Sequence, residues 1–374
     1  MSQAFLDQVA RFALDEVTPP AAQWSMGADP DPALVQRAAE LGILGMQVGQ
    51  DFGGRGMDFA TRAQACALLA GADFGFAMSL VNTHNIALRL AEIAPERITR
   101  RYLPDLLAGR ISACTSLTEP TTGSDFAAVT TTARKTAAGW VLNGEKIWII
   151  NGRHAAVSIV YAQCKTVGDS SGIGAFLVDL TAPGVARYAI DAGFAQTSLG
   201  TGGFTLDTVT LEPDALLIPP GSAFKAILTE INAARTYVAA MCNGMVRSAV
   251  GCVRSYGTQR LSFGKPLNTI PSWQTSLTGA EVALEASVAC TQRAIDLVAA
   301  GADAQLAAAQ AKIMAVACAQ TQLPELLQLM GAEGLRPGHP FTRHIAGAHI
   351  AGFTDGATNI LKERVARLTA PREA

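Results

Sequence analysis

The sequence predicts a mainly α-helical protein with a β domain in its middle. Residues 1–112 show short helical patterns, residues 113–218 show short β-branched segments between turns, and residues 219–374 show long helical patterns with short connections. At roughly 150 residues per domain, a chain of 374 residues suggests two or three domains. We therefore expect an N-terminal α-helical domain (1–112), a small β-barrel or sandwich (113–218) and a C-terminal four-helix bundle (219–374).

The N-terminal segment has the periodicity of several short helices. Apolar residues from Leu34 to Leu44 recur at helical spacing, and Pro32 precedes them at a position that a first helical turn tolerates. Residues 74–90 and 96–107 continue the helical pattern. This block is predicted to be all-helical.

The middle segment has the texture of strands. Residues 140–150 predict two strands joined at Asn143-Gly144, because Asn-Gly is a strong signal for a tight hairpin turn. Residues 157–161 and 174–179 are further strand candidates. Several short strands at this spacing predict a barrel or a sandwich.

The C-terminal segment predicts four long helices. Residues 223–260 contain no proline and consist almost entirely of helix formers, which would give a helix about 55 Å long. Residues 271–300, 304–330 and 340 onward form three more helical patterns. Short connections between long helices predict an antiparallel bundle.

Composition narrows the functional class. Hydrophobic residues make up 49% of the chain and charged residues 16%, with a formal net charge of −2, which excludes a disordered chain and argues against a protein that grips nucleic acid or an anionic membrane. Seven cysteines without C-x-x-C spacing argue against disulfides and zinc. No basic leader and no apolar run of about 18 residues is present. We expect a cytoplasmic protein without a metal site, a nucleic-acid partner or a membrane segment.

Two polar clusters stand out in the β segment. Residues 117–125 read Leu-Thr-Glu-Pro-Thr-Thr-Gly-Ser-Asp, a turn rich in hydroxyls and backbone N–H groups that could hold phosphate or a polar ring edge. Residues 141–152 place Trp148 at a strand end, where an indole could cover a flat cofactor. Each cluster alone is equally an ordinary turn or a core tryptophan.

Together, the two clusters closely resemble the signature of the acyl-CoA dehydrogenase family, L-T-E-P-x-x-G-S-D followed by V-L-N-G-x-K-x-W-I-T-N-G. Further matches extend the resemblance over the whole chain, at residues 41–56, 101–104, 256–266 and 328–334. The resemblance implies an α domain, a β-barrel and a four-helix bundle. It also implies noncovalent FAD, a homodimer or homotetramer, and a flavin whose AMP end is held by a neighbouring subunit.

The resemblance also assigns roles to individual residues. Thr118 would bond the flavin ring edge, Trp148 would pack on the ring, and Arg260 would pair with the pyrophosphate across the subunit interface. The residues implied in cofactor binding are Thr115, Leu117, Thr118, Gly123, Ser124, Trp148, Ile150, Arg260, Phe263, Gln328, Gly331, Ala357 and Asn359. Ser124 and Arg235 would contact the substrate, Ser124 through the pantetheine arm.

The family reaction needs a base that removes the α proton of a thioester while flavin N5 takes the β hydride. Asp355 stands where the family carries a glutamate, although Asp-Gly by itself is a common turn. Some relatives carry the base just before the bundle arginine, but Ala234 occupies that position here. Asp355 is thus the predicted base. It is one methylene shorter than glutamate, and Ile150 and Ala357 each replace a family threonine.

Three functions remain open at this point. The first is an FAD-dependent dehydrogenase of an acyl thioester on CoA or an acyl carrier protein, passing electrons to a flavoprotein or oxygen. This first function includes a specialised enzyme of secondary metabolism, such as one that oxidises a carrier-bound polyketide extender unit. The second is a flavin monooxygenase or oxidase on the same scaffold, which retention of Thr118 and Ser124 disfavours. The third is a flavin-binding protein without turnover.

Overall fold

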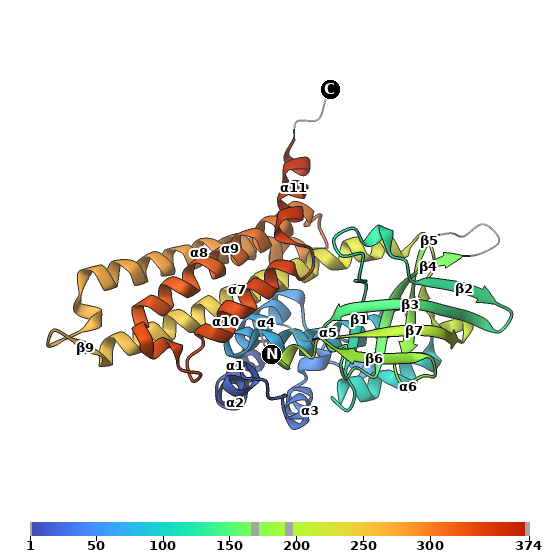
Figure 1. The fold of residues 1–374 in the computed structure, drawn as a ribbon, viewed down its shortest axis with the longest axis horizontal. Helices are drawn as coiled ribbons and strands as arrows, with labels where there is room; N and C mark the ends of the chain where they lie inside the picture. The colour runs from blue at the N-terminus through green and yellow to red at the C-terminus, as the bar shows by residue number, and fades with distance from the viewer. Residues whose placement is uncertain (1, 166–171, 191–196, 371–374) are drawn as a thin grey trace.

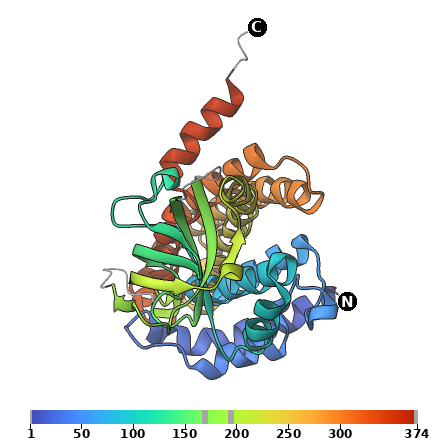
Figure 2. The same ribbon diagram turned by 90° about the vertical axis from the view of Figure 1, so that its right-hand side faces the viewer.

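The computed structural model describes residues 2–165, 172–190 and 197–370. The molecule is elongated, with a helical body at one end and a twisted sheet at the other (Figure 1). The final helix projects away from both, so its far end lies at a distance from the first helix of the chain (Figures 1 and 2). The structure therefore shows a sheet segment inserted between two helical segments of the chain, as the sequence texture predicts.

Six α-helices and one π-helix, with two short 3-10 turns at Ile43–Gly45 and Gln50–Phe52, make up the first block as far as the structure describes it. The helices are α1 (Ser2–Phe12), the π-helix η1 (Ala13–Val17), α2 (Thr18–Trp24), α3 (Pro32–Glu40), α4 (Phe59–Ala72), α5 (Phe74–Ile93) and α6 (Glu96–Leu107). Three of these helices begin at an aspartate whose side chain accepts a bond from a backbone N–H of the first turn, at Asp31, Asp58 and Asp73. The helices predicted from Pro32, over 74–90 and over 96–107 are confirmed.

The middle segment forms one eight-stranded sheet. Its strands are β1 (Ala113–Ser116), β2 (Thr132–Thr136), β3 (Gly139–Ile149), β4 (Val157–Lys165), β5 (Gly172–Asp179), β6 (Val185–Ala189), β7 (Gly202–Leu211) and β8 (Leu216–Ile218). The order is β6-β7-β3-β2-β4-β5-β8, and β1 pairs in parallel with β4. Among the described residues no strand pair closes this path into a ring, so the sheet is confirmed and barrel closure is not.

The predicted hairpin at Asn143-Gly144 is wrong. Residues 139–149 form the single strand β3, and the chain reverses between Thr136 and Gly139 instead. Asn143-Gly144 marks a bulge against β7, where the Asn143 side chain accepts a bond from the backbone N–H of Thr208 at 2.8 Å. Gly144 has φ +154°, and a Cβ there would lie 2.5 Å from the Thr131 hydroxyl. The glycine serves a close approach of two strands rather than a turn.

The C-terminal block consists of α7 (Ala223–Gln259), α8 (Pro271–Ala299), α9 (Gln305–Met330), α10 (Phe341–Phe353) and α11 (Thr358–Thr369), with the short hairpin β9 (Leu261–Ser262) and β10 (Lys265–Pro266) after α7. Helices α7 to α10 pack together, and α4 of the first block packs on α7. The fourth predicted helix is broken after Phe353, so α11 leaves the bundle at an angle (Figure 1). That break holds Asp355.

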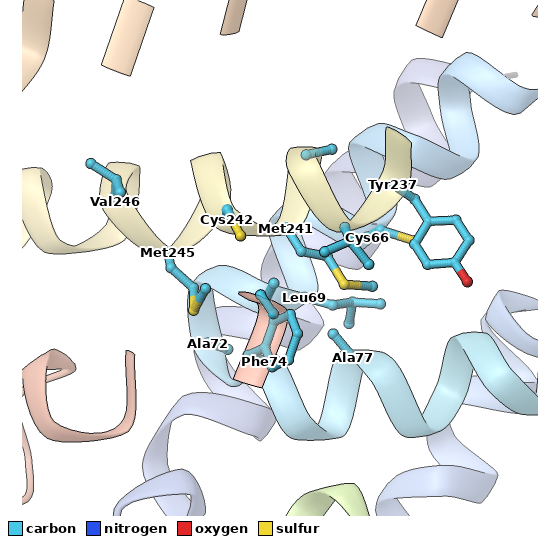
Figure 3. Close-up of a cluster of buried hydrophobic side chains, with 14 of the residues drawn as sticks. Cys66, Leu69, Ala72, Phe74, Ala77, Tyr237, Met241, Cys242, Met245 and Val246 are labelled. Atoms are coloured by element: carbon cyan, nitrogen blue, oxygen red, sulfur yellow. The ribbon is translucent and has the colours of Figure 1, made fainter. Parts of the chain in front are cut away.

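The main core joins the first block to the bundle. Figure 3 shows side chains of α4, α5 and α7 that interleave, among them Leu69, Phe74 and Met241. Tyr237 lies at one end of this cluster with its hydroxyl directed away from the other labelled side chains (Figure 3). The apolar packing thus ends at a polar group.

Candidate active site

The turn after β1 is held from inside by a glutamate. Glu119 is buried, and its carboxylate accepts bonds from the backbone N–H groups of Thr130 (2.6 Å) and Thr131 (2.9 Å) and from the Thr130 hydroxyl (2.7 Å). Lys146 of β3 donates to the same carboxylate at 2.8 Å and to the carbonyl of Leu117 at 3.1 Å. The loop 117–131 is therefore fastened to β3 by one buried ion pair.

The pair explains why this turn has a fixed shape. Burial alone would raise the pKa of Glu119, but the bonds from Lys146, Thr130 and Thr131 outweigh it and lower the pKa to about 2. The carboxylate is thus ionised at neutral pH. Sequence reasoning gave Glu119 and Lys146 no role, although both are letters of the motifs that it singled out.

The exposed side of the same turn presents the predicted cofactor residues. Thr118 is half-buried, and its carbonyl accepts a bond from the backbone N–H of Ile147, which ties the turn to the strand of Trp148. Gly123 and Ser124 are exposed at the tip. The structure therefore brings the turn residues and the Trp148 strand side by side. Thr115 and Leu117, both half-buried, lead into the turn.

Trp148 lies in an unusual backbone conformation. It has φ +59°, and 55% of its surface is exposed. Asn151, three residues on, has φ +64° and is fully buried, with its amide donating to the carbonyls of Ser79 (2.9 Å) and Ala113 (3.0 Å) and accepting from the Ser79 hydroxyl (2.6 Å). The asparagine anchors the strand end to α5, which leaves the indole facing outward. An exposed indole held in this way is better placed to cover a flat cofactor ring than to fill the core.

The predicted base lies in the break between α10 and α11. Asp355 has φ +53°, a left-handed conformation that aspartate tolerates better than most side chains, and Gly356 follows with φ +106°. Its Oδ2 is buried and has no hydrogen-bond partner among the described residues. A carboxylate oxygen left without a donor is available to accept a proton.

Two cations fasten the backbone around this aspartate. Lys312 of α9 is fully buried and donates to the carbonyls of Thr354 and of Gly356, the latter at 2.6 Å. Arg235 of α7 donates to the carbonyl of Asp355 at 3.2 Å and to the Asn232 side chain at 3.2 Å. Three consecutive carbonyls are thus held by buried cations, so the carboxylate itself stays unbound. Sequence reasoning found Arg235 but missed Lys312.

Electrostatics set the protonation of the site. Burial raises the pKa of Asp355, and Lys312, Arg235 and Arg62 oppose that rise. Burial likewise lowers the pKa of Lys312 to about 8, against the attraction of Asp355. A carboxylate with a raised pKa is a stronger base than an exposed one, which is the property that proton abstraction requires.

The remaining predicted residues fall into two places. Ala357 and Asn359 begin α11 directly after Asp355. In both ribbon views the loop after β1, drawn in teal, lies on the same side of the sheet as the start of α11 (Figures 1 and 2). Ile150 is half-buried against the main core beside Asn151.

The second place is the far end of the bundle. Arg260 and Phe263 lie at the β9–β10 hairpin, at the opposite end of the molecule from the sheet (Figure 1), and Phe263 is 99% exposed with φ +50°. Gln328 and Gly331 are exposed at the end of α9, where the carbonyl of Leu329 accepts a bond from the Trp273 indole at the start of α8. One chain therefore does not bring these four residues to Thr118 and Trp148.

Metal-binding clusters and membrane-spanning helices are both absent from the described part of the chain. No group of three or more histidine, cysteine, aspartate or glutamate side chains there could hold a metal ion. No helix within those residues is long and apolar enough to cross a membrane.

A sheet between helical blocks, an outward tryptophan beside a hydroxyl-rich turn, and a carboxylate with an unpartnered Oδ2 among the described residues fit the class that the two motifs predict, a flavin-dependent oxidoreductase acting on an acyl thioester. Comparison with known families agrees. Models described as the N-terminal, middle and C-terminal domains of acyl-CoA dehydrogenase match residues 2–110, 114–209 and 221–369. The chain belongs to the acyl-CoA dehydrogenase family and is an FAD-dependent oxidoreductase acting on CH–CH bonds.

Individual relatives match along nearly the full chain. The human mitochondrial short-chain specific acyl-CoA dehydrogenase is 29% identical over 96% of this chain and 87% of its own length. The structure of butyryl-CoA dehydrogenase from Megasphaera elsdenii is 26% identical with a TM-score of 0.91, covering 98% of this chain and 97% of the other. Glutaryl-CoA dehydrogenase from Mycobacterium smegmatis in complex with FADH2 is 26% identical with a TM-score of 0.90, covering 100% and 95%.

The residues present fit a flavin. Trp148 and Phe263 are large exposed aromatic side chains in left-handed conformations, which is costly for residues of this size unless the position is used. Next to Trp148, the turn 117–124 offers hydroxyls on a rigidly held backbone. An aromatic face beside such polar groups suits a flavin ring.

Proposed function

We propose that Asp355 is the base of this dehydrogenase and takes the α proton of an acyl thioester. The observation that carries the assignment is its buried, unpartnered Oδ2 on a turn whose three backbone carbonyls are held by Lys312 and Arg235. Because those cations bind the backbone, they orient the carboxylate without occupying it. The three neighbouring positive charges also oppose the rise in the pKa of Asp355 that burial causes, which favours the ionised carboxylate.

The division of labour follows from this geometry. FAD, when bound, supplies the acceptor for the β hydride. Asp355 receives the α proton on Oδ2. Lys312 and Arg235 keep the turn from moving toward the substrate as the carboxylate loses its charge, because their bonds run to carbonyls and persist when Asp355 is protonated.

The flavin would be held by two groups of residues from two chains. The first group surrounds the sheet end and α11: Thr115, Leu117, Thr118, Gly123, Ser124, Trp148, Ile150, Ala357 and Asn359. The second comprises Arg260, Phe263, Gln328 and Gly331 at the far end of the bundle. Since the two groups lie at opposite ends of one molecule (Figure 1), a shared flavin requires a homodimer or homotetramer.

Further assignments concern the substrate carrier and the electron acceptor. Ser124 is exposed at the turn tip, as a contact to the pantetheine arm requires. CoA is the carrier that the names of the relatives favour, and an acyl carrier protein is the alternative. Electrons would leave to a flavoprotein or to oxygen. The domain boundaries 1–112, 113–218 and 219–374 and a cytoplasmic location also belong to this proposal.

The direct experiment uses the FAD-loaded protein without oxygen. A panel of acyl-CoAs and acyl carrier proteins is added, and flavin bleaching and products are recorded. Bleaching with an α,β-unsaturated product supports the proposal and identifies the carrier. Absence of bleaching with every thioester, together with oxygen-dependent hydroxylation after chemical reduction of the flavin, would show that the chemistry is that of a monooxygenase.

A further inference from the structure

A second cation lies near the base without any acidic partner. Arg62 of α4 is 4% exposed, and among the described residues no carboxylate forms an ion pair with it. Its guanidinium donates through Nη1 to the Gln47 side chain at 2.8 Å and through Nη2 to the Asn85 side chain, both neutral amides. A buried guanidinium is normally compensated by an acid, so this arrangement is incomplete.

The free edge of this guanidinium is well defined. Arg62 Nε is buried and has no hydrogen-bond partner among the described residues. The neighbour one helical turn on is the thiol of Cys66, a weak acceptor. The ring of Tyr237 lies 4.7 Å from the guanidinium carbon, which fixes the guanidinium plane. The side chain is therefore rigid, charged and short of acceptors.

Arg62 and Asp355 belong to one polar region. Arg62 and Asp355 both act electrostatically on Tyr237, and Arg62 acts on Asp355 itself. Three buried cations, Arg62, Arg235 and Lys312, act on this single carboxylate. Unlike Lys312 and Arg235, Arg62 makes no bond to the turn that holds Asp355 among the described residues. Arg62 therefore acts on Asp355 through its charge alone, and its buried Nε still lacks an acceptor.

We propose that Arg62, together with Gln47 and Asn85, binds a carboxylate on the acyl group of the substrate, at a point away from the thioester. This inference rests on the proposed function and narrows its substrate class to acyl thioesters that carry a second, free acid. A guanidinium with an unpaired Nε suits a carboxylate because its donors lie in one plane with fixed spacing. A fatty acyl chain would instead leave Nε unpaired in an apolar site.

The test compares matched thioesters that differ only at the far end of the chain. Glutaryl-CoA, 5-hydroxyvaleryl-CoA and valeryl-CoA form the five-carbon set, with four- and six-carbon sets alongside to cover chain length. With the FAD-loaded wild-type protein, we expect kcat/KM for the best acid to exceed that of its methyl counterpart by about 10- to 100-fold, the range of a hydrogen bond to a charged group. Equal values, or a preference for the hydroxyl series, would overturn the carboxylate assignment.

The residue is tested by Arg62→Gln, with Arg89→Gln as the matched control. Arg89 is a partly buried arginine of the same helical block that is paired with Glu230. We expect Arg62→Gln to abolish the preference for the acid, so that kcat/KM becomes equal for the acid and the methyl series measured side by side. The control should keep the preference. Thermal unfolding and FAD content of both variants show whether each protein is intact.

Binding without turnover separates this inference from the function it rests on. Calorimetric titration of the Asp355→Asn variant with the same thioesters reports affinity alone. Tighter binding of the acid in this variant, lost on adding Arg62→Gln, supports the site even if no thioester reduces the flavin. If the acid, hydroxyl and methyl series reduce the flavin at equal rates and bind with equal affinities, the carboxylate site at Arg62 is refuted. The proposed dehydrogenase function is then still supported.

Discussion

At the scale of single residues, Asp355 stands out because its buried Oδ2 has no hydrogen-bond partner among the described residues. Its backbone is held on both sides by Lys312 and Arg235, while Oδ2 remains free. Burial raises its pKa, and three cations limit that rise. A short side chain on a rigid, left-handed turn can thus serve where the family carries a glutamate. The sequence pointed to this residue by position alone, because a D-G pair looks the same in any turn.

The first prediction concerns Asp355 itself. Asp355→Asn keeps the shape of the side chain and removes its basicity, so flavin reduction by substrate should slow by about 10²- to 10⁴-fold. FAD content should not change. The measurement is turnover together with the flavin absorbance of the purified variant. A variant with wild-type turnover would remove Asp355 from the mechanism.

The second prediction concerns the pH dependence of the reaction. The base must be ionised, so activity rises with pH through the pKa of Asp355. Lys312→Met removes a positive charge that holds this pKa down, so the acid limb of the kcat profile should move to higher pH.

The same profile provides the control. In Lys312→Met the midpoint of the acid limb should move to higher pH. A purely structural role of Lys312 would lower kcat equally at every pH and leave that midpoint where it is.

At the scale of elements, the turn after β1 owes its shape to a buried ion pair rather than to its exposed residues. Glu119 and Lys146 lie beneath Thr118 and Ser124 and join the loop to β3. Breaking a buried pair from one side leaves an uncompensated charge, so the turn should depend on both partners.

The third prediction tests this pair. Glu119→Gln should lower the free energy of unfolding by about 3–5 kcal/mol and reduce FAD retention, because Lys146 loses its counter-charge. Asp125→Asn, an exposed acid in the same turn, is the matched control and should change neither quantity. The two are compared by chemical denaturation and by the ratio of flavin to protein absorbance. Equal effects would mean that general loss of acidity, not the pair, matters.

Periodicity predicted most of the elements and failed where tertiary contacts decide. The helices α3, α5 and α6 of the first block, the strands β4 and β5, and the helices from Ala223 to Met330 follow patterns visible in the chain. Asn143-Gly144 was misjudged because its asparagine caps a bulge on β7, a partner that a local signal cannot reveal. The last helical pattern was predicted as one helix, yet it breaks at the base turn. Arg62 and Lys312 were missed because burial of a cation is invisible in a sequence.

At the scale of the whole molecule, the sheet and the β9–β10 hairpin lie at opposite ends (Figure 1). This separation decides whether one chain or two chains would hold the flavin. Exposed aromatic residues mark both ends, Trp148 at one and Phe263 at the other (Figure 1). High apolar content and low charge fit a chain that buries further surface between subunits. Assembly would bring the two ends of different chains together.

The fourth prediction follows from that separation. Native mass spectrometry should find FAD only in dimers or tetramers, and Arg260→Gln should reduce FAD retention without unfolding the chain. Arg254→Gln is the matched control on the same helix, since Arg254 is exposed and paired with Glu281 at 2.6 Å. A monomer that carries FAD would contradict a flavin shared between chains.

The central claim is that this protein oxidises an acyl thioester with Asp355 as the base. The most direct measurement is the rate of flavin reduction in a single anaerobic turnover, using substrate deuterated at the α carbon. The account predicts bleaching that is slower with the deuterated substrate, because proton transfer to Asp355 is part of the step, and almost none in Asp355→Asn. Bleaching at the same rate in Asp355→Asn, with an unchanged isotope effect, would contradict it.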